Sequence, residues 1–157
     1  MATPNRNAPE GKSASVTPLP TAAVPRRPDR KLQLDDVLKL MLADGLVGAD
    51  QAEDLHRSGR HGRDNHPLVL IAGLKLHSRK PPHRILHLEW LTEWLAGKLG
   101  IEYMHIDPLK IDFAAVTSVI SNAYAERYRI LPVAVTKLEL IVATSEPFIR
   151  GWADELE

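Results

Sequence analysis

The hydrophobic positions from residue 34 onward first follow the period of a helix. Apolar residues recur three and four positions apart, which predicts a helix with one buried face. These residues are Leu34, Val37, Leu38, Met41 and Leu42. Gly45 then stands where a helix end favours a left-handed residue. A second short helix from about Gly48 is expected to complete a helical hairpin.

Two further apolar segments follow before residue 100. The run at 67–76 fits a helix or a strand by its period, and we favour a helix because Pro67 suits the first helical turn. Residues 78–84 contain Pro81 and Pro82 and are expected to form a loop. The next helix has the clearest apolar side. That side consists of Leu88, Leu91, Trp94, Leu95 and Leu99.

Beyond Gly100 the period shortens to that of a strand. Residues 101–106 alternate in character and predict a strand, and Asp112 is a plausible cap for a helix that continues toward Tyr128. Residues 130–135 and 138–143 predict a β-hairpin in which Pro132 marks an edge or a strand end. A last helix is expected after Thr144 or Ser145, with Pro147 near its start. Helices followed by a small βαββα unit indicate the α+β class.

The first thirty residues differ from the rest of the chain. They hold half of the 12 prolines and no aromatic residue, so they cannot bury enough apolar surface to offset chain entropy. We therefore expect a disordered tail at 1–30, a helical subdomain at 31–100 and an α/β subdomain at 101–157. The final helix reaches residue 157 without a capping residue, which suggests continuation into a further domain.

Composition and charge narrow the possible functions. The 157 residues include no cysteine, which excludes disulfides, thiol catalysis and cysteine-ligated metals. No apolar run approaches the length of a membrane span, so a cytoplasmic protein is expected. The net charge of zero is a cancellation of blocks. Residues 1–30 carry +3, residues 31–55 carry −4, residues 56–84 carry +6 and residues 85–157 carry −5.

Catalytic and metal chemistry find little support in the sequence. The chain contains no phosphate-binding G-x-x-x-x-G-K-[ST] loop, no G-x-G-x-x-G and no G-x-S-x-G, so we expect no enzyme activity from it. His83 and His87 are four residues apart, but they follow two prolines and lack a third ligand. We therefore expect no metal.

The basic block at 56–84 is the strongest candidate for ligand binding. Arg57, Arg60 and Arg63, with two glycines nearby, suit a phosphate or an acidic surface. The alternative is a solvated basic loop that balances its acidic flanks. Nucleic acid is disfavoured because no aromatic residue lies between positions 56 and 84 to stack on bases.

The three tryptophans are expected to be core or interface anchors. Trp90 and Trp94 lie on the helix that ends near residue 99, and Trp152 lies in the last helix. Trp152 is the candidate for contact with a partner protein.

Three segments in the second half share a known pattern. Residues 99–109 read L-G-x-x-Y-x-x-x-D-P-L, a strand that follows Tyr128 contains L-P-V, and residues 140–147 read L-x-x-A-T-x-x-P. In this order and spacing they resemble the N-terminal domain of type II secretion and type IV pilus-assembly ATPases. The resemblance implies a non-catalytic docking domain that couples a hexameric ATPase to the cytoplasmic domain of an inner-membrane platform protein. It also implies a cytoplasmic location, peripheral to the inner membrane through such partners.

Part of this family binds cyclic di-GMP through tandem R-L-G-x-x-L-V-x-x-G-L motifs. With Gly45 on the second glycine of the first motif, Asp36, Val37 and Leu38 occupy the places of Arg, Leu and Gly. An acid there would repel a phosphate, and a second copy near residues 64–73 is no better preserved. Cyclic di-GMP or another anion, bound through the basic 57–63 segment, is therefore the alternative to docking.

Overall fold

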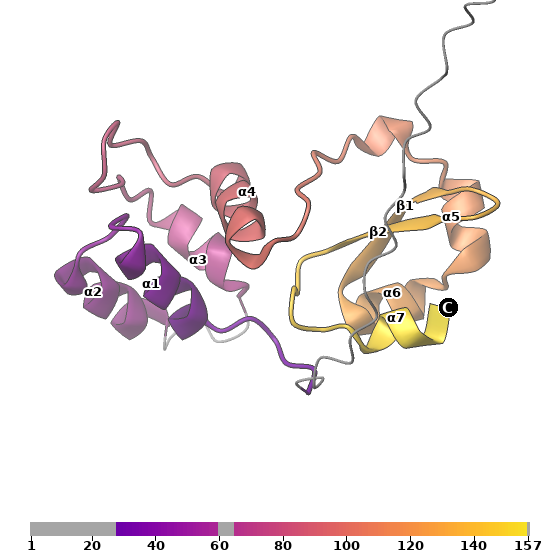
Figure 1. Ribbon diagram of the computed structural model, residues 1–157, viewed down its shortest axis with the longest axis horizontal. Coiled ribbons are helices and arrows are strands. Elements are labelled where there is room, and N and C mark those ends of the chain that lie inside the picture. Colours follow the sequence, from indigo (N-terminus) through magenta and orange to yellow (C-terminus); the bar gives the residue numbers. More distant parts are fainter. Residues whose placement is uncertain (1–27, 60–64, 157) are drawn as a thin grey trace, which may run out of the picture.

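The computed structural model of the protein describes residues 28–59 and 65–156. They form a helical unit and an α/β unit that lie side by side (Figure 1). The helical unit contains α1 (Leu34–Ala43), α2 (Ala49–Gly59), α3 (Pro67–Gly73) and α4 (Leu88–Leu99). The α/β unit contains the 3-10 helix η1 (Pro108–Lys110), α5 (Phe113–Val119), α6 (Asn122–Tyr128), β1 (Ile130–Val135), β2 (Leu140–Thr144) and α7 (Gly151–Leu156). The predicted α+β class is confirmed, while residues 1–27 of the predicted tail lie outside the described residues.

The core of the helical unit comes from the apolar faces that the spacing predicted. Its fully buried side chains are Val37, Met41, Leu55, Ile71, Leu86 and Leu91. The prediction of a helix at 67–76 is correct for α3, and Gly45 has the left-handed φ of 69° expected after α1. The turn between α1 and α2 is closed by the Leu46 amide, which donates to the Met41 carbonyl at 2.9 Å.

The sheet of the α/β unit has two antiparallel strands, as the hairpin prediction required. Ile130 pairs with Thr144, and Val135 pairs with Leu140. The register shifts between Pro132 and Ala134, because proline has no N–H to donate to the ladder. Helices α5 and α6 pack against β1.

Three sequence predictions for the second half are wrong in detail. Residues 101–106 form no strand, because their partly buried side chains face a cavity instead of pairing with a neighbouring strand. The helix expected from Asp112 to Tyr128 is interrupted at Ile120, which has extended dihedrals, and Ser121 caps the second piece. The last helix begins at Gly151, because residues 145–150 are irregular, and the Thr144 hydroxyl at the end of β2 accepts a hydrogen bond from the Glu146 amide.

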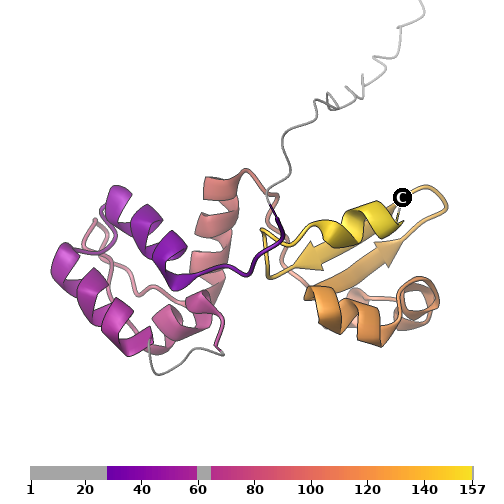
Figure 2. The same cartoon turned by 90° about the horizontal axis from the view of Figure 1, so that it is seen from below.

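A short segment before α1 joins the two units, and we call residues 29–33 the strap. The Asp29 carboxylate accepts hydrogen bonds from the amides of Arg150 (3.0 Å) and Gly151 (2.8 Å), so it caps α7. A Cβ at Gly151 would lie 2.7 Å from Asp29 Oδ2, and glycine therefore permits this close approach. Figure 2 shows the indigo segment before α1 running from the helical unit toward the yellow segment that precedes α7.

The second anchor of the strap is buried. The Leu32 amide donates to Glu146 Oε2 at 2.7 Å, and Glu146 is only 6% exposed. Arg30 lies 4.3 Å from the centre of the Phe148 ring and also pairs with Asp36 of α1. The strap thus ties the 146–151 segment to the first helix of the other unit.

Replacing the buried carboxylate should loosen the two units. In Glu146→Ala the Leu32 amide loses its acceptor inside the protein, and we expect a loss of about 1–3 kcal/mol in the free energy of unfolding. Hydrogen exchange should accelerate in the strap and in residues 146–151. Denaturant unfolding and hydrogen exchange measure both effects. Glu139→Ala, at an exposed position in the hairpin turn, is the matched control, and equal effects of the two variants would contradict this role of Glu146.

Asp44 gives the helical unit a pH-dependent contact. Its carboxylate accepts from Lys98 Nζ at 2.6 Å and from Trp94 Nε1 at 2.8 Å, and these bonds, that of Lys98 first, lower the pKa of Asp44. Because the pKa of Asp44 is lower in the folded chain, its contacts stabilise the fold at pH values above about 4, the pKa of aspartate in an unfolded chain. This stabilisation is lost as the pH falls through the pKa of the folded state. We expect Asp44→Asn to be less stable than the native chain near neutral pH and the difference to shrink in acid. Denaturant unfolding over a pH series checks this, and a constant difference would contradict it.

Candidate functional site

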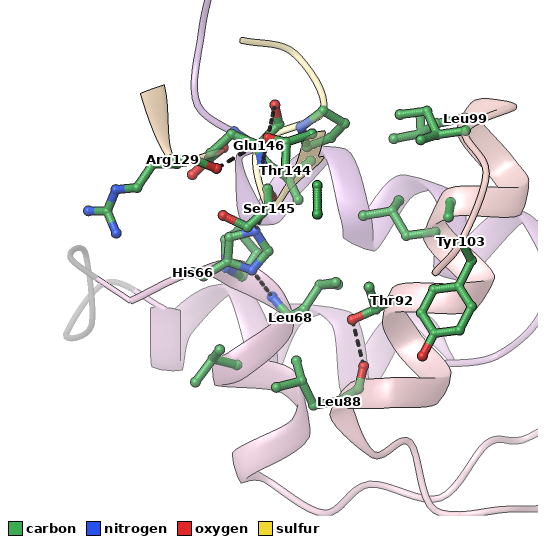
Figure 3. A pocket seen from close by; sticks show the side chains of 18 of the residues that line it. His66, Leu68, Leu88, Thr92, Leu99, Tyr103, Arg129, Thr144, Ser145 and Glu146 are labelled. Carbon is green, nitrogen blue, oxygen red and sulfur yellow. Dashed lines mark hydrogen bonds between the residues drawn. The ribbon is translucent and has the colours of Figure 1, made fainter. Parts of the chain in front are cut away.

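A cavity of about 1010 Å³ lies between the two units (Figure 3). Its walls come from the start of α3, one side of α4, the crossing segment 101–106 and the end of β2. Most of its wall is aliphatic. The aliphatic residues include Leu68, Leu88, Leu95, Leu99, Ile106, Val133 and Ile141. The strap closes part of its edge, so the contacts of Glu146 also set the shape of the cavity.

The polar groups of the cavity include neutral donors beside the charged side chains of Lys31, Glu102, Arg129 and Glu146. Tyr103 donates to Glu89 at 3.3 Å, and burial followed by the negative charge of Glu89 raises the pKa of its hydroxyl, which stays a neutral donor. The Thr92 hydroxyl donates to the Leu88 carbonyl at 2.8 Å. Tyr103 and Thr92 thus place neutral hydroxyl groups on the mostly aliphatic wall.

His66 connects the cavity wall of the helical unit to that of the α/β unit. Its Nδ1 accepts from the Leu68 amide at 3.3 Å, and its Nε2 lies 2.9 Å from the Ser145 carbonyl oxygen. An acceptor at Nδ1 and a donor at Nε2 together correspond to the neutral imidazole. His66 therefore caps α3 and crosses between the units, as Figure 3 shows.

Of the three predicted arginines the structure describes only Arg57, and Arg57 does not line this cavity. Arg57 points along its own helix, where it pairs with Glu53 and Asp54, both at 3.3 Å. Arg60 and Arg63 lie outside the described residues. The residues that flank this segment, Gly59 and Asn65, do border the cavity.

Asp36, Val37 and Leu38, the triplet aligned with the Arg-Leu-Gly of the cyclic di-GMP motif, make contacts within the protein. Arg30 hydrogen-bonds to Asp36 and thereby lowers the pKa of its carboxyl group, so a negative charge stands at the arginine position of the motif. Val37 and Leu38 are buried in the core of the helical unit. The triplet therefore offers no cation and no open backbone to a phosphate.

Trp152 lies where α7 meets α6 within the α/β unit. Its indole N–H donates to the Ile149 carbonyl at 2.9 Å, and its own carbonyl accepts from the Tyr124 hydroxyl at 3.2 Å. The side chain is half-buried, so part of the ring stays accessible. Whether it contacts a partner stays a prediction.

A second cleft, of about 240 Å³, was not singled out by the sequence reasoning. It is lined by Lys80, Pro81, Pro82, Arg84, Trp90 and Trp94, together with Asp44, Leu46 and Ser78. The signal was present in the sequence: two prolines between basic residues, followed by two tryptophans four positions apart. The sequence could not show that the loop folds back onto this helix.

Within residues 28–59 and 65–156, no helix has the length and apolar character to cross a membrane. In the same ranges, no group of three or more His, Asp or Glu side chains is arranged to hold a metal ion.

Comparison with known proteins bears on the second half of the chain most directly. Residues 99–157 match the MshEN domain family. The chain is also 38% identical over 92 residues to the type IV pilus assembly ATPase TfpB of Acinetobacter baylyi, an alignment that covers 59% of this chain and 16% of that relative. The chain thus spans about a sixth of the length of the relative. These matches confirm the resemblance stated above: residues 99–157 are similar to MshEN domains, and the chain is similar to part of a pilus assembly ATPase.

Proposed function

We propose that this chain is a non-catalytic docking and regulatory part of a type II secretion or type IV pilus-assembly ATPase. In this role it couples the motor to the cytoplasmic domain of an inner-membrane platform protein, and it lies at the cytoplasmic face of that membrane through its partners. The match to a pilus assembly ATPase supports the kind of machine. An exposed apolar surface on the α/β unit supports the docking role.

That surface lies at the end of the α/β unit remote from the helical unit. Phe113 of α5 is 58% exposed, and Leu138 at the hairpin tip is 95% exposed. In both views of the fold, α5 and the hairpin tip lie on the side that faces away from the helical unit (Figures 1 and 2). Large apolar side chains exposed at one end of a small unit are typical of a protein-binding surface. This exposure is the observation that carries the proposal.

The docking proposal predicts loss of binding when this surface becomes polar. We expect the double variant Phe113→Ser, Leu138→Ser to bind the platform domain at least about tenfold more weakly, because aromatic and large apolar anchors carry most binding energy. A pull-down with the full-length motor, followed by titration calorimetry, measures this. Leu42→Ser, at an exposed apolar position of the helical unit, is the control and should bind normally. A native motor that retains no platform domain would contradict the proposal.

A second candidate function is a sensor of cyclic di-GMP or another anionic ligand. It is favoured by one observation: the large cavity is bordered by Gly59 and Asn65, which flank the segment that carries Arg60 and Arg63. Arg129 and Lys31 also line the cavity and supply positive charge from its other sides. An anion with an apolar or planar part would suit this combination.

Calorimetry with cyclic di-GMP separates the sensor from the docking domain. A true ligand at a hundred times its dissociation constant should stabilise the chain by about 2.7 kcal/mol and raise its unfolding temperature. Arg60→Gln and Arg63→Gln should weaken binding. Arg57→Gln should change it little, because Arg57 is already paired on α2. No heat and no thermal shift at high ligand concentration would remove the sensor interpretation.

A further inference from the structure

The loop between α3 and α4 is held in one defined shape. The Ser78 amide donates to the Arg84 carbonyl at 2.9 Å, and the Leu86 amide donates to the Leu76 carbonyl at 2.8 Å. The Arg79 amide donates to the Leu46 carbonyl at 2.9 Å and pins the loop to the helical unit. Ser78 is buried, and its hydroxyl bonds to both the amide and the carbonyl of Lys80. Side chains on this loop are therefore presented from a fixed backbone.

The loop lies in a segment that contains several basic residues and no acidic residue. Residues 65–88 contain four cations and no carboxylate. The cations are Lys75, Arg79, Lys80 and Arg84. Arg79 reaches Asp50 at 3.4 Å, whereas within the described ranges neither Lys80 nor Arg84 forms an ion pair. Both cations are exposed and accessible to an incoming anion, although Lys80, after Lys98 and Trp94, also helps to lower the pKa of Asp44.

These two cations stand beside an aromatic cleft. Trp90 and Trp94 stack with ring centres 6.3 Å apart and planes inclined by 11°. The Arg84 guanidinium lies 5.8 Å from the centre of the Trp90 ring, which orients it by a cation–π contact. Trp94 is held by its bond to Asp44. The cleft therefore combines two tryptophans and two prolines with the cations Lys80 and Arg84, and its one carboxylate, Asp44, is already bonded to Trp94 and Lys98.

Carboxylates on the neighbouring helices limit the size of an anionic partner. Asp50 of α2 lies beside the loop through its contact with Arg79, and on α4 Glu89 and Glu93 directly precede Trp90 and Trp94 in sequence. A long polyanion such as nucleic acid, or a flat anionic membrane, would meet these like charges. A short acidic segment with an apolar residue would not extend so far, and that residue could enter the cleft.

We propose that residues 77–86, with Trp90 and Trp94, form a docking surface for a short acidic peptide segment of a partner protein. Lys80 and Arg84 would pair with its carboxylates, and an apolar side chain would rest on the tryptophans. This proposal rests on the docking function and names a second contact surface and its partner chemistry. It is separate from the exposed apolar end of the α/β unit.

The test uses the full chain and a short synthetic peptide of alternating glutamate and leucine. Titration calorimetry and tryptophan fluorescence should detect binding that weakens as salt is raised. The same peptide with glutamine in place of glutamate should bind at least about tenfold more weakly, since each charged hydrogen bond is worth about a factor of ten. Equal binding of the two peptides would overturn the proposal.

Charge variants locate the binding. One double variant replaces Lys80 and Arg84 with glutamate, and a second replaces both with glutamine. We expect each of them to bind the peptide at least about tenfold more weakly. The double variant Lys110→Glu, Lys137→Glu makes the same charge change on exposed parts of the α/β unit and should bind normally. A thermal unfolding temperature equal to that of the native chain shows that a variant folds. If the glutamate double variant does not fold, the glutamine double variant tests the proposal. Unchanged affinity in a folded Lys80 and Arg84 variant would overturn the assignment.

Competing partners give distinct results. If a single-stranded DNA oligonucleotide or phosphatidylglycerol vesicles bind the native chain more tightly than the acidic peptide, the acidic-peptide assignment is overturned. If the platform domain is retained but the peptide does not bind, docking stands and this surface is not used. If the peptide binds at Lys80 and Arg84 but no platform domain is captured, this surface stands and the platform proposal fails.

Discussion

The arrangement of the two units depends on a hydrogen bond between the Leu32 amide and the buried carboxylate of Glu146. Without this acceptor the Leu32 amide would be buried unpaired, and the lost stability would be about as large as that caused by a typical destabilising mutation. The contact therefore strongly favours one arrangement of the units. Asp29 adds a cap on α7, and Arg30 adds contacts to both units. The large cavity exists because these contacts, with that of His66 to Ser145, hold two small cores side by side.

The charge pattern acquires a clear meaning once the chain is folded. Several charged side chains form ion pairs within the chain: Arg30 with Asp36, Arg57 with Glu53, and Lys98 with Asp44. Lys80 and Arg84, in contrast, stand at the rim of an aromatic cleft. The basic block thus contains cations with different roles, and proximity in sequence does not predict which of them face a partner.

Local patterns predicted the helices better than the irregular segments. The faces of α1 and α4 followed from apolar spacing, and the β1–β2 hairpin followed from its β-rich runs. Residues 101–106 alternate like a strand, but they have no partner strand in the described residues, and five of the six line the cavity. The start of α7 was misplaced because its cap is Asp29, more than a hundred residues away in the chain. Sequence reasoning identified the basic block but not the cleft that Lys80, Arg84 and Trp90 share.

By itself the sequence determined the α+β class, the amphipathic helices and the three motifs that mark an MshEN domain. These depend on residues close together in the chain, where period and turn chemistry are sufficient. Only the tertiary structure decided that Glu146 joins the units, that Asp36 is paired, and that a loop with two prolines meets two tryptophans. Such contacts join residues far apart in sequence, and their free energy depends on burial and geometry that no local pattern records.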